Sequence, residues 1–396
     1  MRVLPSRRIV AGLAFVLAGT TSSLAADAQA FAERLKAIMA EQQVELSYSG
    51  ATSEGDDVLL SGTTLRGTGA AAGDATSLGD LRFESVTGST PEGWRVGRVA
   101  PGDVDVTEGP TRTRASGMVV EGLQIAGTAP AATAVSPLLF DRLALGSMNV
   151  EQEGRPVFSL ETAELRTAGT AESGYTGTFG VQRFTADTQA ATTEETPAKA
   201  TMRELGYAQL AGSMSGNASW TPQSGALTLD PLKVTVDDAG TLDFSYTITG
   251  YTPSFIQSLT QLSQQMQASG GQNDASGMAV IGLISQLYLQ SAQLSFTDDS
   301  LTNRLLDYYA KQANQTREQM VTGLVGSLPL ALAYLQNAEF QAEVTAAVKD
   351  FLENPEALRI SIAPPAPVPA TQILGAAMGA PQTLPQVLNL TVTSGN

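Results

Sequence analysis

A short pattern recurs between residues 79 and 187 and constrains the fold more than any other feature of the sequence. In each copy an apolar residue is followed by an acidic or amide residue, any residue, and a second apolar residue. The polar members of the five copies are Glu84, Glu121, Asp141, Glu161 and Gln182, and the last three gaps between them are 20, 20 and 21 residues. About 20 residues accommodate two short strands with their turns. The pattern therefore predicts a platform of repeated strand pairs.

The fold class that we predict is mainly β with a C-terminal helical cluster, an α+β arrangement. Strands that follow one another with short turns favour a long antiparallel sheet that curves into a groove. A parallel β-helix also has coils of about 20 residues and is the main alternative. A closed barrel is a further possibility. The order and direction of neighbouring strands distinguish these architectures.

The carboxylates of the five copies suggest two roles. Equal spacing would stack them in a column on one face of the sheet, where an ion could bind. Like charges in adjacent strands repel each other, which favours a solvated polar face instead. The two tryptophans, Trp94 and Trp220, flank turns; they either fill the core or stack on a ligand.

Composition excludes several classes of function. The formal net charge of the 396 residues is −16 with only 23 Lys and Arg, which argues against nucleic acid as a partner. Neither Cys nor His occurs, so disulfides, thiolate nucleophiles, Ser-His-Asp triads and haem ligation are excluded. We therefore expect a protein that is not an enzyme and that uses neither a cofactor nor a metal.

The first 25 residues have the features of a cleavable signal peptide. Arg2, Arg7 and Arg8 precede an apolar run from Ile9 to Ala18, and small residues precede a cleavage site near Ala26. Sec and twin-arginine export both remain open. We expect a periplasmic protein without a transmembrane anchor after cleavage, because no later segment reaches the roughly 20 apolar residues of a membrane span.

Composition also predicts two domains. Residues 26–190 would hold an N-terminal helix, from 27 to 43, and the repeat-built β domain. Residues 191–200 would be a polar linker, and residues 201–396 would form a β-hairpin and a helical cluster. The hairpin is expected around Asp237-Asp238, and helices are expected over 253–270, 278–290 and 301–352. We expect an extended connector at 363–369 and a last strand at 387–393.

The predicted helices supply the candidate binding residues. Their apolar side chains recur with helical spacing and exceed what a small helical cluster needs for its own core. We expect them to form an apolar groove or its lid. The candidates are Phe255, Leu259, Met266, Met278, Ile281, Ile284, Leu305 and Met320.

Short motifs in the second half carry a resemblance to known sequences. The segments 227–232, 239–242 and 292–301 resemble uncharacterised exported proteins of Gram-negative envelopes, and the chain is similar to AsmA-like β-rich envelope proteins. The resemblance covers residues 219–310 and the strands before them. It implies an envelope location and no catalytic residues. The chain departs from AsmA-like proteins because it has no retained membrane helix, which puts a membrane-bridging role in doubt.

Two functions of different class follow from these expectations. In the first, the sheet forms an extended groove that binds a lipid or other apolar envelope molecule. In the second, the sheet is a structural or scaffolding module whose edge strands pair with an envelope protein.

Overall fold

The computed structural model describes residues 27–67, 75–129, 136–190, 195–268 and 274–395. The predicted signal peptide, residues 1–25, lies outside them. The strands are β1 (Val44–Ser47), β2 (Gly50–Glu54), β3 (Asp57–Gly67), β4 (Thr76–Glu84), β5 (Thr87–Ser89), β6 (Gly93–Val99), β7 (Val104–Glu108), β8 (Thr111–Ser116), β9 (Val119–Ala126), β10 (Leu138–Leu139), β11 (Arg142–Gln152), β12 (Arg155–Thr170), β13 (Gly174–Asp187), β14 (Gln209–Thr221), β15 (Ala226–Val236), β16 (Gly240–Thr249), β17 (Tyr288–Asp298), β18 (Ala357–Ile362), β19 (Val368–Pro369) and β20 (Leu390–Ser394). The helices are α1 (Ala28–Glu41), α2 (Pro197–Glu204), α3 (Pro253–Ala268), α4 (Asp274–Ile284), α5 (Leu301–Gln312), α6 (Arg317–Ala331), α7 (Ala338–Glu353), α8 (Ala370–Gly379) and α9 (Leu384–Leu388), with single 3-10 turns η2 (Ala333–Leu335) and η3 (Pro381–Thr383).

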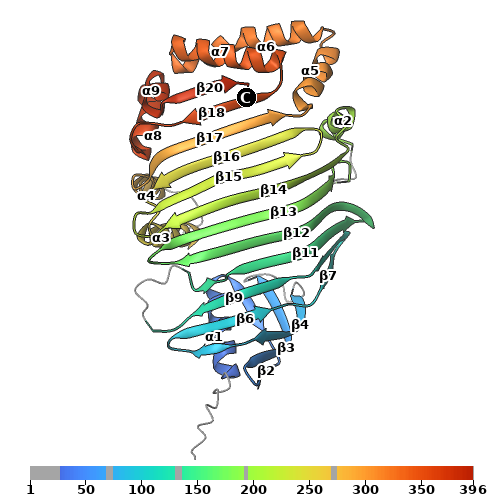
Figure 1. Cartoon of the computed structure of the whole chain (residues 1–396), viewed down its shortest axis with the longest axis vertical. Coiled ribbons are helices and arrows are strands. Elements are labelled where there is room, and N and C mark those ends of the chain that lie inside the picture. The colour runs from blue at the N-terminus through green and yellow to red at the C-terminus, as the bar shows by residue number, and fades with distance from the viewer. Residues whose placement is uncertain (1–26, 68–74, 130–135, 191–194, 269–273, 396) are drawn as a thin grey trace, which may run out of the picture.

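All described strands belong to one antiparallel sheet, which Figure 1 shows as a tall ladder. From β11 to β18 each strand pairs with the next along the chain, and β18 then pairs with β20. The short strand β19 pairs with β17. The sheet is open, with β1 and β2 at one end and β20 at the other. The mainly β fold with a C-terminal helical cluster is thus confirmed. The parallel β-helix is excluded because these neighbours are antiparallel.

The first part of the sheet packs on α1, at the foot of Figure 1. Phe31 and Ile38 lie two turns apart on one side of the helix, and the side chain of Asp27 caps its N-terminus. This apolar side is buried against Val58 of β3 and Trp94 of β6. The predicted N-terminal helix is confirmed.

The recurring pattern marks irregularities inside long strands. Two of its copies lie within β12 and β13, which are 16 and 14 residues long. At the third position of three copies, Ser85, Gly122 and Thr162 have φ angles of +53°, +64° and +49°, as bulged residues often do. The prediction of two short strands for every 20 residues is wrong, because one long strand and its turn occupy this spacing.

The sheet continues across the predicted linker at 191–200. Strand β13, which precedes this segment, pairs with β14, which follows it, from Tyr175 opposite Trp220 to Asp187 opposite Gln209. Helix α2 begins inside the segment, at Pro197. Division of the chain into two domains stays a prediction.

The second half contains most of the predicted elements. β15 and β16 form the expected hairpin. Thr316 and Gln319 form a capping box at the start of α6. The helix predicted over 278–290 ends earlier than expected, because β17 begins at Tyr288. Helix α4 ends at Ile284, and the side chain of Ile281 is 52% exposed.

The last part of the chain holds helices that were not predicted. Helix α8 follows the proline-rich connector directly, and α9 occupies the beginning of the segment that was predicted as the last strand. The strand itself, β20, begins at Leu390. The prolines of the preceding segment favour an extended chain and give no sign that a helix follows. The alanine and leucine residues of α8 itself favour a helix.

Candidate functional site

The ladder from β11 to β20 has two chemically different faces. Directly opposed residues of antiparallel strands share a face. One row across the strands consists of Leu143, Leu165, Phe179, Gly216, Leu232, Phe244, Leu294, Ile360 and Val392. The next row, on the other side, consists of Ala144, Glu164, Gly180, Ser215, Lys233, Asp243, Ser295, Arg359 and Thr393. We call the side of the first row the apolar face and the side of the second row the polar face.

Bulges preserve this division along the strands. The register shifts between Val181 and Phe184, where β13 pairs with β14, and between Leu229 and Leu232, where β15 pairs with β16. Side chains alternate between the two faces of a strand. Without a bulge, an extra residue would therefore place all the following side chains of its strand on the opposite face. The bulges therefore keep apolar side chains on one side over the full length of the ladder.

Glycines lie under phenylalanine rings on the apolar face. A Cβ atom at Gly216 would lie 2.2 Å from Cζ of Phe179, and one at Gly212 would lie 2.8 Å from Cζ of Phe184. The rings occupy the space that side chains at these positions would fill. They therefore lie low on the sheet and leave room above it.

Helices cover the apolar face at its two ends. At the C-terminal end Phe340 and Val344 of α7 pack on Val392 of β20, and Phe351 makes an edge-on contact with Phe296, with ring centroids 6.3 Å apart. At the N-terminal end α1 covers the strands before β11. Between these ends, Leu143, Leu242 and Leu294 are 36%, 41% and 39% exposed. The middle of the apolar face is therefore open to solvent.

A hollow of about 340 Å³, which we call the central hollow, lies on this open part. Its wall is formed mainly by apolar side chains of β12 to β15 and of the segment before β11. They include Phe140, Leu165, Tyr175, Phe179, Trp220 and Leu227. The rings of Tyr175 and Trp220 stack with centroids 5.9 Å apart. Its volume lies within the range of about 300–1,000 Å³ that is typical of small-molecule sites.

Hydrogen bonding fixes the aromatic wall of the central hollow. Nε1 of Trp220 donates to the backbone oxygen of Tyr251 at 2.7 Å, which orients the indole ring. Burial raises the pKa of Tyr175, so its phenol is neutral at physiological pH. The wall thus presents flat, uncharged surfaces that suit an apolar ligand.

A second hollow, of about 780 Å³, lies among α5, α6 and α7. We call it the helical hollow. Leu305 and Tyr309 of α5, Met320 and Leu324 of α6 and Phe351 of α7 line it. It is also mainly apolar, and it lies beside the covered end of the apolar face.

Two of the predicted site residues line a hollow together. Leu305 and Met320 both line the helical hollow. The other candidates lie on α3 and α4, which stand beside the strand ends (Figure 1) and line neither hollow within the described residues. Of these candidates, Phe255 is buried, Met266 packs half-buried on the same cluster, Ile284 is half-buried, Leu259 and Ile281 are exposed, and the side chain of Met278 is outside the described residues.

Sequence reasoning missed the strand residues of the central hollow. Both tryptophans were considered as residues that could stack on a ligand. Of the two, Trp220 does lie in the wall of the central hollow. Trp94 instead fills the core, with its ring 5.7 Å from that of Phe31. The alternation of apolar and polar residues in β12 to β14 indicates which side chains share the apolar face. The register that brings Leu165, Phe179 and Trp220 together depends on bulges, which are hard to predict from sequence.

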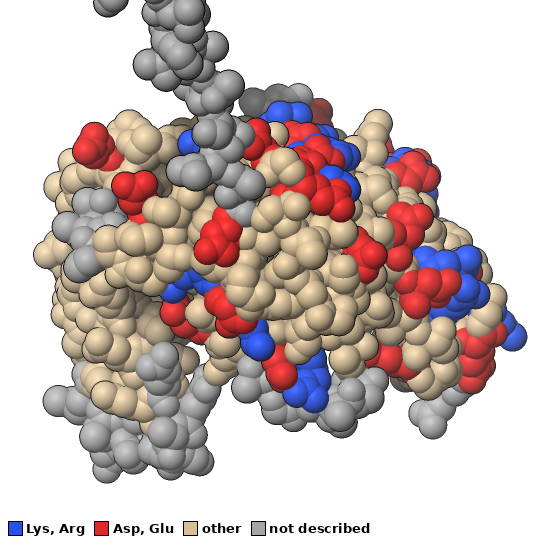
Figure 2. Space-filling model, turned by 90° about the horizontal axis from the view of Figure 1, so that it is seen from below, with Lys and Arg blue, Asp and Glu red and all other residues tan. Residues whose placement is uncertain are grey.

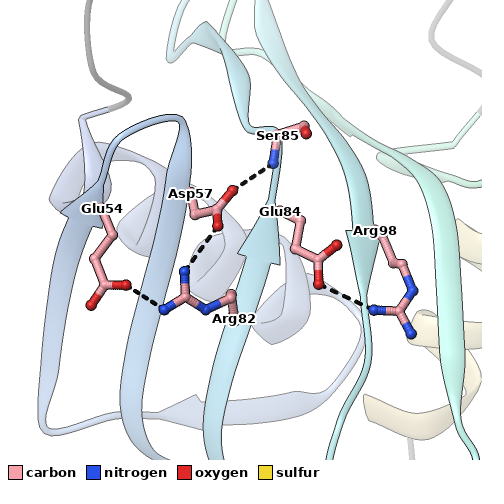
Figure 3. A network of polar contacts seen from close by, with 6 residues as sticks. All are labelled: Glu54, Asp57, Arg82, Glu84, Ser85 and Arg98. Carbon is pink, nitrogen blue, oxygen red and sulfur yellow. Dashed lines mark hydrogen bonds and ion pairs between the residues drawn. The ribbon is translucent and has the colours of Figure 1, made fainter.

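Three carboxylates of the recurring pattern, Glu84, Glu121 and Asp141, form ion pairs with arginines. Figure 3 shows Glu84 with Arg98, at 3.1 Å, beside a cluster in which Arg82 bridges Glu54 and Asp57. Glu121 pairs with Arg142 at 3.3 Å, and Arg142 also contacts Glu164. The residues directly opposite Glu121 are arginines, so the acidic side chains do not form a column. Among the described residues no group of three or more carboxylates could hold a metal ion.

Acidic residues at turns and at one helix start have structural partners. Asp57 accepts from the backbone N–H of Ser85 at 3.0 Å and from Arg82 at 2.9 Å, and these two donors lower the pKa of its carboxyl (Figure 3). Asp237 contacts Arg183 at 3.1 Å, and Asp298 accepts from the backbone N–H of Thr302 at 2.7 Å. These interactions stabilise turns and a helix start.

Comparison with known proteins adds little to the geometry. A family model described as an uncharacterized protein matches residues 233–395, from the second half of β15 to the end of β20. A search of curated proteins finds no match. None of the described helices combines the length and the apolar character that a membrane crossing needs.

Proposed function

We propose that this is an exported, non-enzymatic protein of the periplasm that binds a lipid, or another apolar molecule of the cell envelope, on its long β-sheet. The observation that carries the proposal is the uncovered middle of the apolar face. Leucines there keep more than a third of their surface in water, next to a hollow with an aromatic and aliphatic wall. Removing such surface from water contributes about 25 cal/mol per Å² to binding.

An acyl chain suits this surface better than a polar ligand does. In the central hollow, the apolar side chains are accompanied by few polar ones, such as Gln124, Thr167 and Asp141. The face continues beyond the hollow along rows of Leu, Val and Phe, which would accommodate an extended molecule. The helical hollow, with Leu305 and Met320, offers further apolar volume near one end.

The second candidate function is a scaffolding module that pairs with a protein through a sheet edge. The observation in its favour is that the sheet is open: within the described residues, β2 pairs only with β3, and β20 pairs only with β18. An unpaired edge can accept a strand from a partner. Cross-linking in the periplasm would then recover one specific protein through residues of β2 or β20.

Organic extraction of the purified protein, followed by mass spectrometry, tests lipid binding, together with uptake of a fluorescent fatty acid. We expect Phe179→Asp to abolish uptake, because it places a charge in the wall of the central hollow. Thr178→Asp is the matched control, since its side chain lies on the opposite face of the same strand. Absence of both co-purified lipid and fatty-acid uptake would contradict the proposal, as would equal loss of uptake in the two variants.

A further inference from the structure

Large apolar side chains protrude from the helices beside the C-terminal strands. Leu330 near the end of α6 is 82% exposed, Met378 of α8 is 81% exposed, and Tyr334 of η2 is 63% exposed. Ile281 of α4 and Leu374 of α8 are also exposed. We call these five residues the helical tip. Monomeric soluble proteins seldom expose such side chains in a group, and a group of this kind usually marks an interaction site.

The elements that carry the helical tip contact one another. The hydroxyl of Tyr334 donates to the backbone oxygen of Ala377, the residue before Met378. Helix α8 contacts α4, and its first residue, Ala370, donates its backbone N–H to the oxygen of Leu287 at 2.9 Å. Leu330 precedes Tyr334 by one helical turn. The protruding residues therefore belong to one connected surface.

The sequence around the helical tip is almost free of charge. Residues 319–338 and 360–396 contain no Asp, Glu, Lys or Arg, and Asp274 is the only one between Asp243 and Asp298. These stretches include α3, α4, α8, α9 and most of α6. The net charge of −16 is therefore carried elsewhere. Figure 2, which views the molecule from the end at the foot of Figure 1, shows acidic and basic side chains gathered on its centre and right.

We propose that the helical tip docks on the surface of a lipid bilayer and inserts its protruding side chains among the lipids. An acidic protein is repelled by anionic headgroups, so it approaches a bilayer most easily through a surface without charge. Exposed Leu and Met side chains gain free energy when they enter the acyl boundary, and Tyr is favoured at the headgroup level.

This inference goes beyond the proposed cargo binding. It concerns how the protein reaches a bilayer, and it holds whether or not the central hollow carries a lipid. The insertion of a few side chains is weak and reversible, as a protein that moves between a membrane and the surrounding fluid requires.

Flotation with lipid vesicles tests the inference on the full mature chain. We expect binding to phosphatidylcholine vesicles that persists in high salt, because insertion is not driven by charge. We expect weaker binding to phosphatidylglycerol vesicles in low salt, because of repulsion. The double variant Leu330→Ser/Met378→Ser should lower vesicle binding about tenfold or more, since two apolar side chains no longer insert.

A matched pair of single variants, Leu330→Ser and Leu259→Ser, provides the control. Leu259 of α3 is 44% exposed and lines neither hollow, so its loss should leave vesicle binding unchanged. Equal loss in the two single variants would overturn the inference, since the helical tip would then not be the membrane-binding surface. Sedimentation velocity measures whether the protein forms a dimer instead. If the protein does not bind vesicles but forms a dimer that Leu330→Ser/Met378→Ser dissolves, the helical tip is an interface between copies and the inference is wrong.

Discussion

The same apolar face is a closed core at one end of the molecule and an open surface in the middle. Val99, Val120 and Leu143 form one row across β6, β9 and β11, yet Val99 is 5% exposed and Leu143 is 36% exposed. The strands in both regions alternate in the same way, and the difference is the presence of α1. Alternation therefore decides which side of a strand is apolar, whereas a helix decides whether that side becomes core.

Dimensions explain why one helix is not enough. The strands from β11 to β17 are separated by six spacings of about 4.8 Å, which makes the ladder roughly 29 Å wide there. A helix is about 10 Å in diameter. Helix α7 covers only the last strands, and α3 and α4 pack on each other through Leu262 and Leu283 beside the strand ends. The middle of the apolar face stays open because no described helix lies across it.

Matched phenylalanine substitutions should give the largest contrast between the two regions. Phe31→Ala removes a fully buried ring that contacts Phe83 and Trp94, and should cost about 3–5 kcal/mol of unfolding free energy. Phe179→Ala removes a half-buried ring from the open region and should cost about 1 kcal/mol. Urea denaturation followed by tryptophan fluorescence measures both.

The two tryptophans allow the unfolding of the two regions to be followed separately. Trp94 lies beside Phe31 and Trp220 lies in the wall of the central hollow. In a Trp220→Phe background fluorescence reports on the covered end, and in a Trp94→Phe background it reports on the open ladder. Similar losses for Phe31→Ala and Phe179→Ala would show that the open face is covered in solution, and the comparison would fail.

A smaller effect on stability, but a clear one on binding, is expected from Gly216→Ala. The added methyl group would collide with the ring of Phe179, which must then move away from the sheet toward the central hollow. Uptake of a fluorescent fatty acid should fall, while the unfolding free energy changes by about 1 kcal/mol or less. Gly50→Ala in β2 is the control, since a Cβ there meets no atom within 4 Å. If the Gly216→Ala variant takes up as much fatty acid as the parent protein, the central hollow is not the binding site.

Much of the fold could be predicted from local sequence. The spacing of Phe31 and Ile38 predicts α1, and alternation around Asp237-Asp238 predicts the hairpin of β15 and β16; both are confirmed. Helical periodicity led to Phe255 and Met266 as site candidates, but these side chains pack on their own small core. The wall of the central hollow joins Phe140 to Trp220 through the register of four strands, and no local pattern contains that register.

The polar side of the covered region should show the smallest effect, and it depends on pH. Donation from the Ser85 backbone N–H and from Arg82 lowers the pKa of Asp57 in the folded state. A carboxyl with a lowered pKa stabilises the fold above its unfolded pKa of about 4, and this contribution is lost as the pH falls through that range. Asp57→Asn should therefore lower the melting temperature slightly at neutral pH, and the difference from the parent protein should shrink in acid. A difference that stays constant with pH would mean that the ionisation of Asp57 contributes nothing to stability, which would contradict its lowered pKa. A loss as large as that of Phe31→Ala would mean that the polar face, rather than the core under α1, holds this end of the sheet together.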